Sequence, residues 1–156
     1  GLLAGARAWP AATKKGTPPA EGRGFIGSWL MTFREAEGPP TLALATFGAD
    51  GTAVTAEHPV VTPPIAAGVV FTSAGHGAWA ATGPDTAVFT VVGLGSYGRG
   101  VLFGTATARA GITLGADGQT FDGEVVWTIA DPAGNPLATY PGIFQATRIV
   151  AGAPAG

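Results

Sequence analysis

The chain has 156 residues, which suits one domain with a single hydrophobic core. Hydrophobic residues make up 46% and charged residues 12%, a balance typical of globular rather than disordered proteins. A formal net charge of −2 gives no electrostatic footprint for nucleic acid, the absence of cysteine excludes disulfides and thiolate metal sites, and no apolar run reaches the roughly 18 residues of a membrane span.

The chain begins with residues 1–24, in which no periodic pattern is visible and several breakers occur, so we expect a flexible N-terminal segment. Its Ala6-Arg7-Ala8 fits the cleavage site at the end of a secretory signal, which predicts a secreted or extracytoplasmic protein. The alternative is that the sequence begins at an arbitrary point, and a cytoplasmic location then stays open. Residues 151–156 are predicted to form a flexible tail.

Residues 25–150 are predicted to form one β-domain, because apolar and polar residues alternate and the 26 glycines and 13 prolines separate the alternating runs. Asp50-Gly51 and Asp117-Gly118 predict hairpins, Gly75-His76-Gly77 a turn, and residues 93–98 a loop. No helical period of useful length occurs. The expected strands are residues 25–36, 41–47, 52–57, 69–73, 78–82, 86–92, 101–114, 120–130 and 137–150.

Eight or nine strands joined by short turns favour an antiparallel up-and-down β-barrel, because closure removes the exposed sheet edges. A β-sandwich is the alternative. Within residues 101–114 the apolar face is built mainly of small residues, and within 120–130 it carries Phe121 and Trp127. A barrel of this size is either filled by side chains or leaves space for one small ligand.

Gly27-Ser28-Trp29 on the first predicted strand, together with Arg148 on the last, resembles the lipocalin branch of the calycin superfamily. The resemblance implies that the Trp29 ring closes one end of an eight-stranded barrel and that Arg148 lies across it, forming a structural clasp. The end of the barrel that binds a ligand or carries catalysis would then be the opposite one. The T-D-Y-type loop motif, the disulfide cysteines and the C-terminal helix are absent, so the chain resembles a divergent bacterial type.

Few residues point to catalysis. Gly93-Leu-Gly-Ser-Tyr-Gly98 matches the dinucleotide pattern G-x-G-x-x-G, but a strand rather than a helix follows it, which indicates an ordinary loop. His58 and His76 have no metal-ligand spacing, so no metal or cofactor is predicted. His76, expected in an exposed turn near Ser73, is the one candidate for a catalytic role, as a base or as a donor to a ligand carbonyl.

The aromatic residues are the richest set of candidates, because apolar walls with a few polar groups form ligand sites. We expect the ligand-binding residues to be Met31, Phe33, Phe71, His76, Trp79, Phe89, Tyr97, Phe103, Trp127 and Tyr140.

Three functions are consistent with these observations. The first is a lipocalin-like protein that binds a small hydrophobic molecule inside the barrel. The second is a cofactor-free cyclase or isomerase that folds a hydrophobic, natural-product-like substrate in the same cavity. The third is a structural module that forms homo-oligomers through outward-facing apolar residues such as Leu30 and Val126.

Overall fold

Ten β-strands and two short 3-10 helices make up the described part of the computed structural model, residues 22–34 and 40–152. Residues 1–21 and 153–156, which include most of the predicted flexible ends, lie outside it. The elements are η1 (Arg23–Phe25), β1 (Gly27–Phe33), β2 (Thr41–Phe47), β3 (Thr52–Ala56), β4 (Val60–Val61), β5 (Val70–Thr72), β6 (Gly75–Ala81), β7 (Thr86–Ser96), η2 (Gly98–Gly100), β8 (Leu102–Leu114), β9 (Thr120–Ala130) and β10 (Pro136–Arg148).

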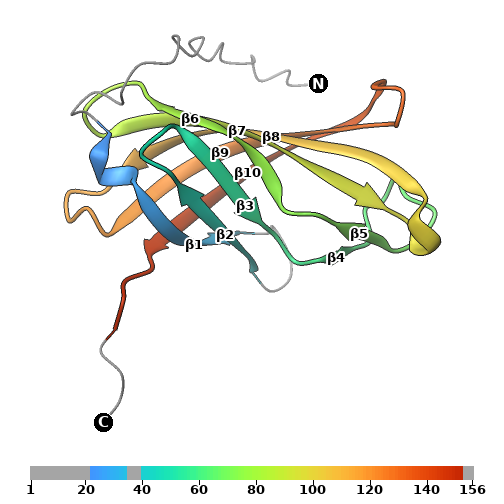
Figure 1. The fold of residues 1–156 in the computed structure, drawn as a ribbon, viewed down its shortest axis with the longest axis horizontal. Helices are drawn as coiled ribbons and strands as arrows, with labels where there is room; N and C mark the ends of the chain where they lie inside the picture. The colour runs from blue at the N-terminus through green and yellow to red at the C-terminus, as the bar shows by residue number, and fades with distance from the viewer. Residues whose placement is uncertain (1–21, 35–39, 153–156) are drawn as a thin grey trace.

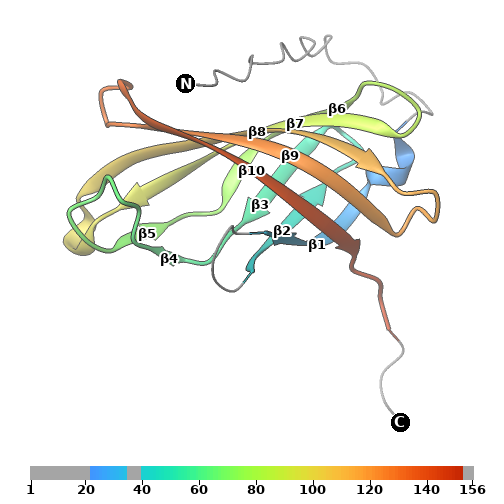
Figure 2. The ribbon, with the colours of Figure 1, turned by 180° about the vertical axis from the view of Figure 1, so that it is seen from behind.

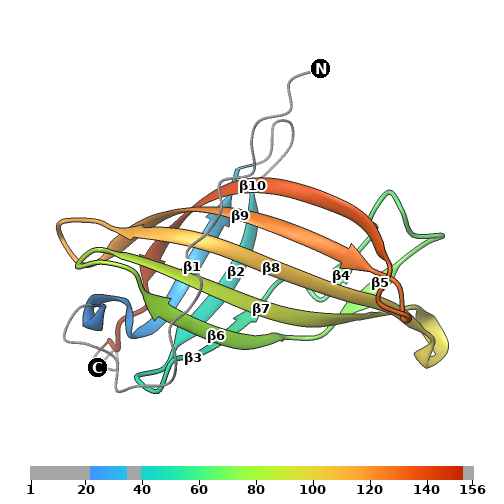
Figure 3. The ribbon, with the colours of Figure 1, turned by 90° about the horizontal axis from the view of Figure 1, so that it is seen from above.

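Eight of the strands close into an antiparallel barrel, which confirms the predicted up-and-down architecture over the alternative sandwich (Figure 1). Each strand pairs with its neighbours in the order β1-β2-β3-β6-β7-β8-β9-β10, and β10 pairs back with β1. Viewed from above, the long strands β7 to β10 form one wall, and β1 to β3 cross beneath them (Figure 3).

The short strands β4 and β5 form an insertion between β3 and β6 rather than a ninth stave of the barrel. β4 pairs with β5, and β5 pairs with the last residues of β7 through Phe71 and Thr72. The insertion therefore prolongs the wall at the end of the molecule far from η1, as Figure 2 shows from behind. We call this the cavity end.

The two predicted Asp-Gly hairpins are present, and side-chain hydrogen bonds account for both. The Asp50 carboxylate accepts the backbone N–H of Thr52 at 2.9 Å, and the Asp117 carboxylate accepts that of Gln119 at 2.8 Å. Gly51 and Gly118 have φ values of 85° and 64°, which glycine adopts without strain. These turns fix the register of β2 with β3 and of β8 with β9.

The structure corrects two predicted connections, because glycines there sit inside strands. Gly75-His76-Gly77 is not a turn but the beginning of β6, where His76 pairs with Val54 and Val92. A Cβ on Gly77 would lie 1.8 Å from the Thr90 carbonyl oxygen, so glycine permits close approach of two strands. Likewise, residues 93–96 of the predicted loop continue β7.

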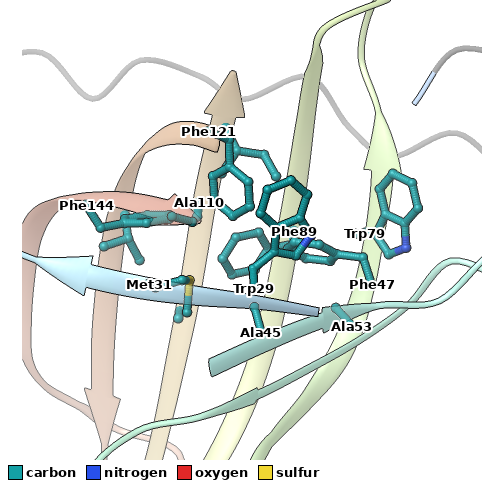
Figure 4. Packing of buried hydrophobic residues seen from close by; sticks show 14 of the residues in the cluster. Trp29, Met31, Ala45, Phe47, Ala53, Trp79, Phe89, Ala110, Phe121 and Phe144 are labelled. Atoms are coloured by element: carbon teal, nitrogen blue, oxygen red, sulfur yellow. The ribbon is translucent and has the colours of Figure 1, made fainter. Parts of the chain in front are cut away.

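The barrel interior toward η1 is filled by aromatic side chains (Figure 4). Trp29 contacts Phe121 with ring centroids 4.6 Å apart, and Phe47 lies 5.4 Å from Phe89 and 5.7 Å from Trp79. Alanines at positions 43, 45, 53, 87 and 110 face the same interior and accommodate these large rings. This half of the barrel is a packed core.

Trp29 and Arg148 close the end of the barrel beside η1, the clasp end. They are direct partners across β1 and β10, and the guanidinium lies 4.1 Å from the indole centroid. Arg148 donates hydrogen bonds to the carbonyl oxygens of Gly24, Ile26 and Gly118. The fully buried Trp29 donates from Nε1 to the Phe25 carbonyl at 2.8 Å. One side chain from the last strand thus joins η1, the first strand and the β8–β9 hairpin.

Candidate functional site

A cavity with a volume of about 90 Å³ lies at the cavity end, where the aromatic core gives way to small side chains. Its walls come from the inner faces of β3, β7, β8 and β9 and from the β4–β5 insertion. They are formed by Thr55, Glu57, Val61, Pro63, Val70, Thr72, Ser73, Gly75, Val91, Gly93, Leu94, Gly95, Phe103, Gly104, Thr105, Ala106, Ala108, Trp127 and Ile129. Most of these side chains are apolar, so the cavity suits a ligand that is mainly apolar.

The alternation of β8 creates the space. Ala106 and Ala108 point inward at alternate positions of the strand, and Gly104 lines the same end, where an added Cβ would lie 2.0 Å from the Ala130 carbonyl oxygen. Ala106 pairs with Gly93 on β7 and with Ile129 on β9. Of these three paired residues, Ala106 has a small side chain and Gly93 has none. Small residues here leave the lumen open, whereas Ile112 further along the strand helps to fill the core.

Glu57 supplies the charge at this cavity. It follows β3, and its Oε1 accepts a hydrogen bond from Nε1 of Trp127 on β9, 3.2 Å away. The Trp127 side chain therefore spans the lumen between two strands that are not neighbours. Glu57 as a whole is exposed to solvent, but atoms around its carboxylate remove part of its hydration and raise its pKa above the ordinary value, while the Trp127 hydrogen bond lowers the pKa by less.

Two of the four hydroxyl side chains that line the cavity, those of Thr72 and Ser73, are engaged with the backbone. Thr72 donates from Oγ1 to the His58 carbonyl at 3.1 Å. Ser73 donates to the Ala74 carbonyl at 2.8 Å and accepts the Leu94 N–H at 2.9 Å. These bonds secure the segment that connects β5 with β6. The Glu57 carboxylate is therefore the polar group best placed to meet a guest molecule.

Tyr97, Phe103 and Ala67 hold the outer rim of the cavity end together. The Tyr97 ring meets Phe103 edge-on, with centroids 5.3 Å apart, and its hydroxyl accepts the Ala67 N–H at 3.3 Å. Tyr97 thus connects the end of β7 to the segment between β4 and β5. Phe103 itself lines the cavity, and its ring would lie 3.2 Å from a Cβ added at Gly95.

No protein-family model matches the chain, and no curated protein matches it.

Among residues 22–34 and 40–152, no three side chains of the metal-binding types gather into a potential ion site. In the same described ranges, no helix has the length and apolar character needed to cross a membrane. The site is accordingly interpreted from its own geometry.

Two predicted ligand-binding residues, Phe103 and Trp127, line the cavity. Met31, Phe33, Phe89 and Trp79 are buried in the aromatic core instead. Trp79 lies toward the clasp end, where its Nε1 donates to the Gly48 carbonyl at 2.8 Å (Figure 4).

The remaining predicted residues lie elsewhere. His76 is exposed on the outer face of β6, and the Ser73 hydroxyl bonds Ala74 and Leu94 rather than this imidazole. Phe71 is 50% exposed, because its neighbour Val70 takes the inward position of β5. Tyr140 is half-buried on β10 opposite Trp127.

Glu57 and Thr55 are two of the polar lining residues that the sequence-based prediction missed. Their signal is parity: Ala53, Thr55 and Glu57 occupy alternate positions along β3 and its extension, the same face that the buried Ala53 assigns to the interior. Thr55 is only 8% exposed. A carboxylate in phase with buried residues at a strand end indicates a polar group at a barrel mouth.

The outer surface carries a larger concavity, about 590 Å³, over β7 to β10. It is open to solvent, and its polar groups bond each other: Arg34 donates to Gln145 at 3.0 Å, and Gln145 donates to Asp122 at 2.9 Å. These mutual bonds make it a weaker candidate than the interior cavity. Leu30 and Leu44 pair on the outer face of β1 and β2 and are exposed, and association of two copies through this face stays a prediction.

Proposed function

We propose that the protein binds a compact, mainly apolar molecule in the cavity between the β4–β5 insertion and β8. The observation that carries the proposal is an apolar space inside a closed barrel, with the Glu57 carboxylate among its lining residues. Apolar walls with a few placed polar groups are the usual form of a small-molecule site. The position at the end opposite the Trp29–Arg148 clasp supports the same interpretation.

The volume limits the size of the ligand. Sites for drug-sized molecules occupy roughly 300–1,000 Å³, several times the space present here. An engineered apolar cavity of about 150 Å³ holds benzene. We therefore infer a short aliphatic chain or one small ring whose polar end remains at the mouth, beside Glu57.

The lipocalin-like interpretation is part of this proposal. The eight-stranded barrel and the arginine over the first-strand tryptophan support placing the chain with divergent lipocalin-like proteins. In such a protein the packed clasp end provides rigidity and the other end provides access. The compact cavity here indicates a smaller ligand than a long polyene or a sterol.

The proposal is tested by titrating ¹⁵N-labelled protein with n-alcohols from propanol to hexanol. The amides of Gly75, Gly93 and Gly95 line the cavity and serve as reporters. Each added CH₂ buried in the cavity should strengthen binding about fourfold, from ~0.8 kcal/mol of transfer free energy, until the chain fills the space. Shifts confined to outer-face amides, or affinity independent of chain length, would contradict the proposal.

The matched controls are two substitutions on β8, one residue apart. Ala106→Leu places a larger side chain in the cavity and should abolish the dependence on chain length, whereas Thr107→Leu lies on the outer face and should leave it intact. Ala106→Val repeats the test if overpacking by leucine unfolds the protein. Equal binding by the filled and control variants would overturn the assignment of the cavity.

A second candidate function, an acid–base isomerase, is supported by the raised pKa of Glu57 in an apolar site. The Glu57 carboxylate would remove a proton from the carbon between an alkene and a ketone and return it to the far alkene carbon. The probe is 4-penten-2-one, whose conversion to conjugated 3-penten-2-one is followed by ultraviolet absorbance. Turnover that Glu57→Gln removes and Glu124→Gln retains would support catalysis, and absence of turnover would exclude this reaction.

A further inference from the structure

The charge at the cavity mouth specifies the chemistry of the ligand's polar end. Among the lining residues, Glu57 is the one ionisable side chain, and no arginine, lysine or histidine joins it there. His58, the next residue, turns its Nδ1 to the Val60 carbonyl, 2.9 Å away. Arg109 is exposed on the outer face of β8. No basic side chain of the described lining therefore balances the Glu57 carboxylate.

One oxygen of this carboxylate is available to a ligand. Oε1 accepts the Trp127 indole N–H at 3.2 Å, and within residues 22–34 and 40–152 the structure shows no hydrogen bond to Oε2. The Trp127 hydrogen bond holds the Glu57 side chain at the mouth, against the lumen. A donor entering with a ligand would complete the carboxylate's set of partners.

We propose that the ligand is a compact aliphatic amine, bound as its ammonium cation, with the nitrogen at Glu57 and the apolar chain against Ala106 and Ala108. This inference rests on the proposed function, since it assigns the polar end of a ligand in the same cavity. The ammonium group supplies a donor for the second carboxylate oxygen and the positive charge that the described lining lacks.

Electrostatics favours this class over its two alternatives. A carboxylic acid ligand would bring a second negative charge beside Glu57, and in a poorly solvated site that repulsion is large. An alcohol would donate one hydrogen bond to the carboxylate but would bring no positive charge, so it lacks the Coulomb attraction that an ammonium group has for Glu57. The Trp127 ring, which also lines the cavity, can add cation–π attraction for an ammonium group but none for a neutral hydroxyl.

The test compares n-butylamine, n-butanol and sodium butyrate, which share a chain and differ in the polar group. Each is titrated at pH 7.5 with the glycine amides 75, 93 and 95 as reporters. The expected order of affinity is amine, alcohol, carboxylate, with the amine about tenfold tighter than the alcohol, as one charge-assisted bond supplies. Butyrate equal to or tighter than the amine would overturn the inference.

Glu57→Gln keeps the size of the side chain and removes its charge. It should weaken the binding of n-butylamine about tenfold more than that of n-butanol, whereas Glu124→Gln, on the outer face of β9, should change the binding of neither. Binding of butanol without preference for the amine overturns this inference and leaves the proposed function standing. Failure of all three probes to reach the reporters overturns both. A retained preference in Glu57→Gln assigns selectivity elsewhere and also overturns the inference.

Discussion

The guanidinium of Arg148 lies directly over the indole ring of Trp29, 4.1 Å from its centroid, and connects the last strand of the barrel to the first. The same group donates to three backbone carbonyls that belong to η1, the η1–β1 connection and the β8–β9 hairpin. A planar cation with several fixed donors suits this set of acceptors, and an ammonium group does not. The pair therefore fixes one end of the barrel and leaves the other end to vary.

Arg148→Lys should lower the free energy of unfolding by about 2–3 kcal/mol, because charge-assisted bonds to half-buried carbonyls are lost and a point charge cannot reach all three. Urea unfolding with an unchanged m-value is the appropriate measurement. The control is Arg109→Lys on the exposed face of β8, which should cost less than about 0.5 kcal/mol. Equal costs for the two variants would show that the clasp contributes nothing specific.

Two inward glycines that face aromatic rings are expected to resist substitution. A Cβ on Gly123 would lie 2.3 Å from the Phe144 ring, and one on Gly142 would lie 2.6 Å from Trp127. Gly123→Ala should destabilise the protein by about 1–3 kcal/mol through overpacking. Gly93→Ala is the matched control, because its Cβ would have no neighbour closer than 3.6 Å, and it should stay within about 1 kcal/mol of the wild type. Thermal unfolding of both variants tests the contrast.

Glu57 should make stability depend on pH in a direction that its environment sets. Burial raises its pKa in the folded protein above the ordinary value of 4.5, so the folded state holds this proton more tightly than the unfolded state. The contribution of Glu57 to the stability of the folded state is therefore present at pH values below 4.5. It is lost as the pH rises through the pKa of Glu57 in the folded protein. Trp127 faces the carboxylate, and within residues 22–34 and 40–152 no other ionisable group lines the cavity.

The corresponding measurement is the melting temperature of Glu57→Gln and wild type at pH 4 and pH 7.5. The melting temperature of the variant should rise relative to that of the wild type at pH 7.5, because the wild-type carboxylate is then ionised and has lost part of its hydration. Asp117 provides a control of opposite sign, because backbone N–H groups lower its pKa and Asp117→Asn should lose stability relative to the wild type as the pH rises from 2.5 to 7. A variant difference that does not change with pH would argue against desolvation of Glu57.

Tyr97→Phe should act locally. Its hydroxyl accepts the Ala67 N–H at the rim, and loss of this bond should speed hydrogen exchange of that amide while the melting temperature changes little. Tyr140→Phe, whose hydroxyl has no hydrogen bond within the described residues, should leave Ala67 exchange unchanged. Slow exchange in both variants would mean that the rim does not depend on Tyr97.

Local chemistry made much of the barrel predictable from sequence. The predicted strands 41–47 and 120–130 match β2 and β9, because each adjoins an Asp-Gly turn whose side chain and glycine specify the hairpin. Elsewhere in the sequence, a glycine alone did not distinguish a turn from a strand position that needs close packing. Gly77 and Gly95 serve close packing rather than turns, and only the positions of Thr90, Val70 and Phe103 reveal that role.

The candidate site was less predictable, because it depends on which strand ends meet in space. Parity assigns Trp127 and Phe103 to a face, but only the closed barrel brings Trp127 to Glu57, 70 residues away along the chain. Trp79 follows a glycine-rich segment and was predicted to bind a ligand, yet its position on β6 places it toward the clasp end, away from the cavity. The Trp29–Arg148 clasp was predictable because its two residues match a motif.

The central claim, that the barrel binds a ligand in its small-residue lumen, is tested most directly by intermolecular nuclear Overhauser effects. Isotope-filtered spectra of the protein with n-butylamine should connect the ligand's terminal methyl group to the methyl groups of Ala106 and Ala108. The Thr107 methyl, on the outer face of the same strand, should show no contact. Contacts to Thr107 or to the exposed leucines of β2, without contacts to the two alanines, would contradict the account.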